Sequence, residues 1–110
     1  MKKKNSNEPK QPPKKLTIEE IDMINEHWEN NEYTSKMYEL IASNQVEQLD
    51  SVLKMNPHVA HIRSEDGRGP MWWAHEMGHK QIVDLLKKQK VSEKRTDQNG
   101  KTPLSISKVK

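Results

Sequence analysis

Residues 75–79 of the chain read His-Glu-Met-Gly-His, an order of residue types that can carry zinc chemistry. On one continuous helix, two histidines at this spacing lie one turn apart and bind Zn²⁺ through their imidazoles, and the glutamate beside them serves as general base. A third ligand is also needed, and Glu93 is the nearby downstream carboxylate that could supply it. The chemistry to weigh is therefore metal-dependent hydrolysis.

The helix that would have to carry both histidines is interrupted in the sequence. Gly78 stands between them, where a glycine favours the left-handed backbone that ends one helix and reverses the chain into another. His75 would then close the first helix and be partly exposed, whereas His79 would open the second. We expect the imidazoles not to converge, and therefore no metal, no cofactor and no catalytic residues.

Composition predicts one small domain. The 110 residues are 31% apolar and 32% charged, and they include no Cys, which excludes disulfides and thiolate chemistry. No apolar run approaches the length of a membrane span, and the N-terminal residues lack the apolar segment of a signal peptide. We expect a cytoplasmic protein, with the nucleus as the other candidate compartment.

Charge is divided unevenly along the chain. Residues 1–15 form a Lys- and Pro-rich segment with a net charge of +5, a composition that predicts a disordered tail. Residues 16–33 carry a net charge of −6 and predict one acidic amphipathic helix, which Thr17 and Glu20 start with a capping box. This helix would cap the exposed apolar face of the unit that follows. Its apolar stripe consists of Ile18, Ile21, Ile24 and Trp28.

Residues 34–110 contain a repeat with a period of 33. Residues 67–71 (GRGPM) align with residues 100–104 (GKTPL). Both glycines that open these segments stand where a tight turn requires positive φ, and both prolines suit the first turn of a helix. Apolar positions recur at the same offset, which is typical of a solenoid of stacked units. The matched columns are Leu40 with Trp73 and Ile106, and Leu49 with Ile82.

The residues DGRGPMWWAHEMGHKQIVDLL, followed by DQNGKTPLSIS, resemble the ankyrin repeat. The unit of that family has a D-x-x-G turn, a first helix beginning T-P-L-H-x-A-A, a G-H turn and a second helix containing I-V-x-L-L. The resemblance implies an all-α fold, a short ankyrin-repeat solenoid of helix-turn-helix units preceded by the amphipathic helix. Its units would be residues 34–66, residues 67–99 and a partial third unit, residues 100–110, which must either fray or dock.

Two residues depart from the family pattern in the middle unit. Trp72 replaces the usual His, and its ring either packs over the turn of its own unit or anchors a partner. Gly69 replaces the Thr that caps the first helix, at an expected cost of about 1 kcal/mol. Trp73, in contrast, lies in an apolar column and should belong to the core.

The resemblance implies protein binding through the turn tips and first-helix surfaces, without catalysis. The chain would act as a small adaptor or as a subunit of a larger assembly, and a stack this short would depend on its partner for stability. The residues that we expect to contact this partner are Trp72, Glu65, Asp66, Arg68, Glu76, Met77, Gln98, Asn99 and Lys101.

Two other functions stay open at this point. A basic accessory subunit of a ribonucleoprotein would use the Lys-rich tail and a second group of basic residues to contact nucleic acid, with binding that weakens steeply with salt. This second group consists of Lys80, Lys87, Lys88, Lys90, Lys94 and Arg95. A zinc hydrolase acting through HEMGH is the other alternative, which the interruption at Gly78 disfavours.

Overall fold

The computed structural model describes residues 15–110, and within this range the chain forms helices and no strand. None of these helices is long and apolar enough to cross a membrane. The disordered tail predicted for residues 1–15 lies outside the described residues, except for its last residue. The five α-helices are α1 (Ile18–Glu26), α2 (Glu32–Ala42), α3 (Val46–Met55), α4 (Pro70–Glu76) and α5 (Lys80–Lys88). Two short 3₁₀ helices, η1 (Pro57–Ala60) and η2 (Leu104–Ile106), follow α3 and α5.

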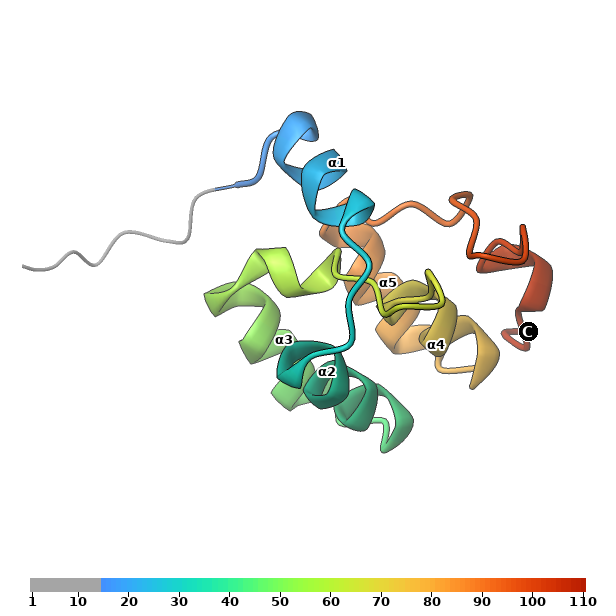
Figure 1. Ribbon diagram of the computed structural model, residues 1–110. Helices are drawn as coiled ribbons and strands as arrows, with labels where there is room; N and C mark the ends of the chain where they lie inside the picture. Colours follow the sequence, from blue (N-terminus) through green and yellow to red (C-terminus); the bar gives the residue numbers. More distant parts are fainter. Residues whose placement is uncertain (1–14) are drawn as a thin grey trace, which may run out of the picture.

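Four of the helices form two hairpins that pack side by side (Figure 1). Helices α2 and α3 make the first hairpin, and α4 and α5 make the second. The first helix of each hairpin packs against the first helix of the other, α2 on α4, and α3 packs on α5 in the same way. The prediction of an all-α chain is therefore confirmed for the described residues.

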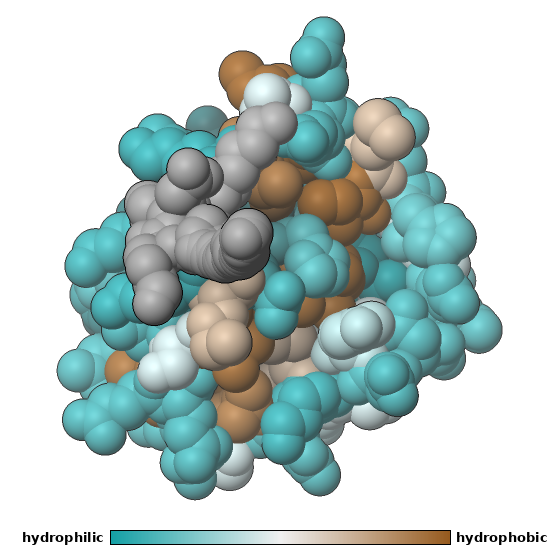
Figure 2. All heavy atoms as spheres, turned by 90° about the vertical axis from the view of Figure 1, so that its left-hand side faces the viewer, coloured by the Kyte–Doolittle hydropathy of each residue, from teal (hydrophilic) through white to brown (hydrophobic). Residues whose placement is uncertain are grey.

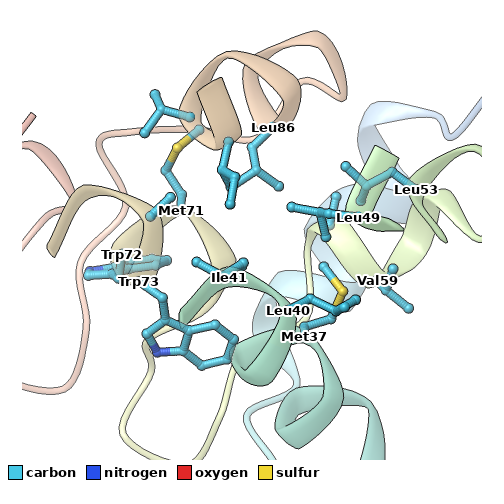
Figure 3. Close-up of a cluster of buried hydrophobic side chains, with 14 residues drawn as sticks. Met37, Leu40, Ile41, Leu49, Leu53, Val59, Met71, Trp72, Trp73 and Leu86 are labelled. Atoms are coloured by element: carbon cyan, nitrogen blue, oxygen red, sulfur yellow. The ribbon is translucent and has the colours of Figure 1, made fainter. Parts of the chain in front are cut away.

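The core lies between the two hairpins and draws side chains from all four helices (Figure 3). Leu49 and Ile82, which align at the 33-residue offset, are both fully buried. Trp73 is buried as predicted, and its ring meets Tyr38 edge to face with 5.3 Å between ring centroids. Each large apolar side chain removed from water in this way stabilises the fold by about 1.5–3 kcal/mol.

Each hairpin reverses at a residue with a left-handed backbone. Gly78 has φ +73° in the second hairpin, and Asn44 has φ +55° in the first. In both turns the amide of the next residue donates to the carbonyl five residues back. His79 donates to Ala74 at 3.0 Å, and Gln45 donates to Leu40 at 2.9 Å. This bond satisfies a carbonyl that the end of the first helix would otherwise leave without a partner. The predicted reversal at Gly78 is confirmed.

The single helix predicted for residues 16–33 is wrong in its extent. Thr17 does start α1 with the predicted capping box, but α1 ends at Glu26 and an extended linker follows. Asn31 then caps α2, accepting from the amide of Thr34 at 3.0 Å, while the Thr34 hydroxyl accepts from the amide of Asn31 at 2.9 Å. This second capping box starts a new helix inside the predicted one, so that the expected boundary at residue 34 falls within α2.

Helix α1 lies across two hollows from the first hairpin, one lined by Ile21 with the end of α3 and η1, the other lined by Ile24 with the start of α2. Figure 1 shows α1 above the end of α5, away from α2. Ile18, expected on the buried stripe, is 78% exposed, and Ile21 and Ile24 are half-buried. The linker after α1 is fixed by a backbone bridge between Trp28 and Arg63, which directs α1 to this position.

Candidate functional site

Two turns repeat the same hydrogen bonds at an offset of 33 residues. In residues 64–68, the amide of Ser64 donates to the carbonyl of Arg68 at 2.7 Å, and Gly67 donates back to Ser64 at 2.8 Å. In residues 97–101, the corresponding distances are 2.9 Å and 3.0 Å. Gly67 and Gly100 have φ of +84° and +76°, so the predicted need for glycine at both places is confirmed.

These two turns lie side by side and are joined to the linker after α1. The amide of Gln98 donates to the carbonyl of Asp66 at 2.9 Å, which links the tips of the two turns. The amide of Glu65 donates to the side chain of Asn30 at 2.9 Å, and the amide of Glu29 donates to the carbonyl of Arg63 at the same distance. Residues 27–31, 64–68 and 97–101 thus form one continuous surface, which we name the turn row.

Arg63 lies beneath the turn row and holds its parts together. Its side chain is almost fully buried, with a residue exposure of 5%, and its guanidinium carbon lies 4.6 Å from the ring centroids of both Trp28 and Trp72. The guanidinium donates to the carbonyls of Gly67 at 2.7 Å and Asn25 at 3.4 Å, and to that of Thr96. A cation between two indole faces, with its donors paired, is a stabilising arrangement even when removed from water.

Burial lowers the pKa of Arg63 from its ordinary value to about 10, and the charge of Arg95 acts in the same direction. The guanidinium therefore stays charged near pH 7. No local pattern in the sequence points to Arg63, because its partners lie up to 38 residues away along the chain.

An ion pair links the two turns above Arg63. Arg68 Nε donates to Asp97 Oδ2 at 2.9 Å, and Asp97 Oδ1 accepts from the amides of Asn99 and Lys101 at 2.8 and 2.9 Å. Burial alone would raise the pKa of Asp97, but these bonds outweigh it and hold the pKa below its usual value. Asp97 is therefore a carboxylate at neutral pH that fixes the conformation of its own turn.

Most of the residues expected to contact a partner lie on or next to the turn row. Glu76, at the end of α4, reaches Arg68 with 3.5 Å between the carboxylate and the guanidinium. Met77 follows it and is half-buried. The structure thus brings together seven of the nine expected residues, with Met77 and Trp72 outside this group. Those exposed on the row are Glu65, Asp66, Gln98, Asn99 and Lys101.

Trp72 is a different case, and its predicted role as a partner anchor is corrected. The residue is only 2% exposed, and its ring packs on Arg63 while Nε1 donates to the carbonyl of Lys101 at 3.0 Å. Packing inside the molecule is the alternative that the structure favours, although the ring meets Arg63 and the turn at residues 97–101 instead of the turn of its own unit. Trp72 supports the turn row from inside and does not present a surface to a partner.

The two histidines of HEMGH lie on separate elements. His75 belongs to the last turn of α4, and His79 is the residue that precedes α5. The spacing therefore does not place two imidazoles on one helical face. Among residues 15–110, no group of three or more His, Cys, Asp or Glu side chains is arranged to hold a metal ion.

His75 is buried, with 3% exposure, so its predicted partial exposure is wrong. The segment around η2 docks on α4 and covers it. His75 Nδ1 lies 2.6 Å from the hydroxyl of Ser107, and Nε2 lies 2.7 Å from a carboxylate oxygen of Glu93. The His75 carbonyl also accepts from the amide of Lys108 at 2.8 Å.

A Ser-His-Glu chain has the composition of a hydrolase relay, but its surroundings favour a structural role. Such a relay needs free backbone amides near the serine to stabilise an oxyanion. The amides of Ser107, Lys108 and Val109 instead donate to Leu104, to His75 and to the Ser107 hydroxyl. The chain of bonds therefore fastens residues 104–109 to α4.

Gly69 has a steric reason to replace the capping Thr. A Cβ atom at this position would lie 2.3 Å from the carbonyl oxygen of Ile62, a distance that no side chain tolerates. Helix α4 accordingly begins without a side-chain cap. The missing cap is the consequence of the close approach of two backbone segments beneath the turn row.

Comparison of the chain with family models, with curated proteins and with solved structures gave no match.

Proposed function

We propose that the chain is a short ankyrin-type stack that binds a protein partner through the turn row, as a small adaptor or as a subunit of a larger assembly. Support comes from the order of packing, first helix on first helix and second on second. The identical hydrogen bonds of the turns at residues 64–68 and 97–101 add to it, since stacked repeats reproduce their turns at a fixed period.

The observation that carries the proposal is the hydrogen bonding that joins the exposed turns into one row. The bond from Gln98 to Asp66 joins the turns at their tips, and the buried Arg63 joins them underneath. A surface that is already ordered loses little conformational entropy when a partner binds. Its exposed side chains carry both signs of charge beside neutral amides, which suits the polar contacts of a protein interface.

Site-specific photo-crosslinking tests this proposal. A photoreactive amino acid is placed at Gln98 on the turn row or at Gln48, which is exposed on α3. We expect the Gln98 probe to form one discrete covalent adduct with a protein in cell extract, and the Gln48 probe to form none of that mass. Equal adducts from both positions, or none from Gln98, would contradict binding through the turn row.

A charge-swapped variant sharpens the same test. Glu65→Lys combined with Lys101→Glu leaves the net charge unchanged but reverses the charge pattern of the turn row. Because misplaced charges at an interface cost several kcal/mol, we expect the Gln98 adduct to fall about tenfold or more. The matched control, Glu47→Lys with Lys54→Glu on α3, should leave it unchanged.

The two alternative functions draw no comparable support. Of the basic residues considered for nucleic acid, Lys80 pairs with Asp84, Lys87 with Glu93 and Arg95 with Asp22. The Lys-rich tail lies outside the described residues. For the zinc hydrolase, the separation of the two histidines removes the geometry on which the motif depends.

A further inference from the structure

Apolar side chains remain exposed near the linker between α1 and α2. On the side of the molecule that Figure 2 faces, apolar atoms form a band between hydrophilic ones. Met23 of α1 is 70% exposed, and Tyr33 at the start of α2 is 52% exposed. Exposed apolar groups that gather in one place, with polar residues around them, mark surfaces that contact another molecule.

Met23 and Tyr33 both line a hollow of about 350 Å³, which we name the α1–α2 groove. Ile24 and Ile62 add to its apolar lining, and η1 contributes His58. Sites for small molecules in proteins usually have volumes of about 300–1,000 Å³. The groove therefore has room for an apolar side chain of a partner.

The segment that forms most of this groove is acidic. Residues 16–33 contain six acidic residues and no Lys or Arg. Glu20 closes the capping box of α1, and Asp22 pairs with Arg95. The other four are all exposed: Glu19, Glu26, Glu29 and Glu32. A surface with one sign of charge attracts ligands of the opposite sign.

Three of these exposed carboxylates lie next to the apolar lining. Glu29 itself lines the groove, and although it contacts His27 at 2.6 Å, its side chain is 51% exposed. Glu19 and Glu26 stand four residues before and three residues after Met23 in α1. Residues at these spacings are neighbours on the surface of a helix, so both carboxylates lie beside Met23.

Arg63 does not reverse this charge. Among the described residues that line the groove it is the one arginine, and there is no lysine. The residue is 5% exposed, and its guanidinium donates to three backbone carbonyls. Its positive charge is therefore already engaged inside the molecule, and the groove presents carboxylates to solvent.

We propose that the α1–α2 groove binds a basic peptide segment of another protein. An apolar side chain of that segment enters the groove, and the Lys or Arg side chains that flank it lie beside the carboxylates of α1 and the linker. Complementary charge of this kind selects basic partners over acidic ones. The groove borders the turn row at residues 27–31, but the proposal does not depend on the function proposed for the turn row.

NMR titration of the full chain, labelled with ¹⁵N, tests this assignment with three synthetic hexapeptides. The first has two leucines flanked on each side by one lysine and one arginine. The second replaces both leucines by serine, and the third replaces the basic residues by glutamate. We expect the leucine peptide to shift the amide signals of Met23, Ile24 and Tyr33 until saturation. The serine peptide should bind at least about fivefold more weakly because it lacks the apolar contact. The glutamate peptide should leave these signals unchanged.

Three other results would overturn the proposal. The first is the absence of shifts at these amides, or equal affinity for all three peptides. The second is a set of shifts confined to Glu65 and Gln98, which would place the peptide on the turn row. The third is a shift of the same amides when the chain alone is concentrated, which would mean that a second copy occupies the groove.

A methionine variant locates the apolar contact. Met23→Gln should weaken binding of the leucine peptide about threefold or more, since apolar contact area is lost. Met55→Gln is the matched control, because Met55 is 74% exposed at the end of α3 and does not line the groove. It should leave the affinity unchanged.

A pair of charge variants locates the carboxylates. Glu26→Gln with Glu29→Gln should also weaken the leucine peptide about threefold or more, since each exposed ion pair contributes modestly. Glu39→Gln with Glu47→Gln removes the same charge from exposed residues that do not line the groove, and should have no effect. All of these side chains are exposed, so we expect the variants to fold. Equal weakening by the test variants and their controls would show that the peptide does not bind in this groove.

Discussion

Arg63 shows how one buried side chain connects segments that are distant in the sequence. Its guanidinium lies between the rings of Trp28 and Trp72. Its N–H groups donate to three backbone carbonyls: those of Asn25 in α1, Gly67 in the first turn and Thr96 just before the second turn. A planar guanidinium can stack on two aromatic faces and still donate in its own plane, which an ammonium group cannot do. The side chain is therefore specific to arginine and not merely to positive charge.

We predict that Arg63→Lys lowers the free energy of unfolding by about 2 kcal/mol or more, because two or more buried carbonyls lose their donor. Urea unfolding followed by circular dichroism measures this. The matched control is Arg95→Lys, at a half-exposed arginine that pairs with Asp22, where the expected loss is below about 1 kcal/mol. A loss at Arg63 no larger than that at Arg95 would contradict its role beneath the turn row.

His61 makes a second prediction at the level of a single side chain, concerning pH. Its pKa is about 4 in the folded chain and 6.5 as the ordinary value, so between these limits the unfolded chain binds more protons. Stability is therefore fully present above pH 6.5 and falls with pH down to about 4, by about 3 kcal/mol in total. Asp97, whose folded pKa is depressed, adds a loss only at lower pH, as its ordinary value of 3.8 is passed.

Urea unfolding at a series of pH values checks this, with His61→Phe as the comparison. The variant cannot take up the proton, so the loss of stability between pH 6.5 and 4 should be smaller by the His61 contribution. Identical pH dependence in the two chains would show that His61 is not buried in its neutral form.

The residues between two helices decide where each hairpin reverses. The reversals at Gly78 and Asn44 show that glycine and asparagine meet the same requirement in the two hairpins, because both tolerate a left-handed backbone. At Gly78 a Cβ atom would also approach the Lys108 carbonyl oxygen to 3.3 Å, a tight contact with the docked C-terminal segment. The conformation of one turn thus affects both a hairpin and the segment that covers it.

We predict that Gly78→Ala costs about 1–2 kcal/mol of unfolding free energy, the usual penalty for a left-handed residue with a Cβ. Gly78→Asn should cost clearly less, because its amide side chain can bond locally in this conformation, as at Asn44. Thermal unfolding of the three chains gives the order. Equal stability of the alanine variant and the parent chain would mean that the backbone does not reverse at this residue.

Helix starts and turn glycines could be predicted from the sequence because the interactions that fix them are local. Thr17 and Glu20 are three residues apart, and the requirement for positive φ at Gly67 and Gly100 belongs to a single turn. The end of α1 could not be predicted as easily. The box that starts α2 pairs Asn31 with Thr34 in place of the usual glutamate, and it lies inside an uninterrupted acidic stretch.

The interior of the candidate site was beyond sequence reasoning, because it depends on packing between distant segments. From the sequence alone, Trp72 is compatible with both an anchor and a buried support, and the contacts of its ring with Arg63 and of Nε1 with the Lys101 carbonyl decide between them. His75 was expected to be partly exposed, and only the docking of residues 104–109 explains its burial. The exposed tips of the turn row were predictable, since they follow directly from the repeat.

As a whole, the molecule is two hairpins whose turns are joined into a row along one edge. Residues 100–110, for which the sequence predicts either fraying or docking, dock through η2 on α4 and through the bonds of His75. The linker after α1 joins the other end of the row, at Trp28 and Asn30. The turn row is thus the feature on which both the proposed stack and its proposed binding surface depend.

The bond between the two turn tips is the most direct test of this arrangement, and it can be observed by NMR in the isolated chain. We predict a scalar coupling across the hydrogen bond between the amide nitrogen of Gln98 and the carbonyl carbon of Asp66, with slow exchange of that amide. An amide of Gln98 that exchanges at the rate of an unstructured peptide, with no cross-peaks between residues 64–68 and 97–101, would contradict the turn row and the function proposed for it.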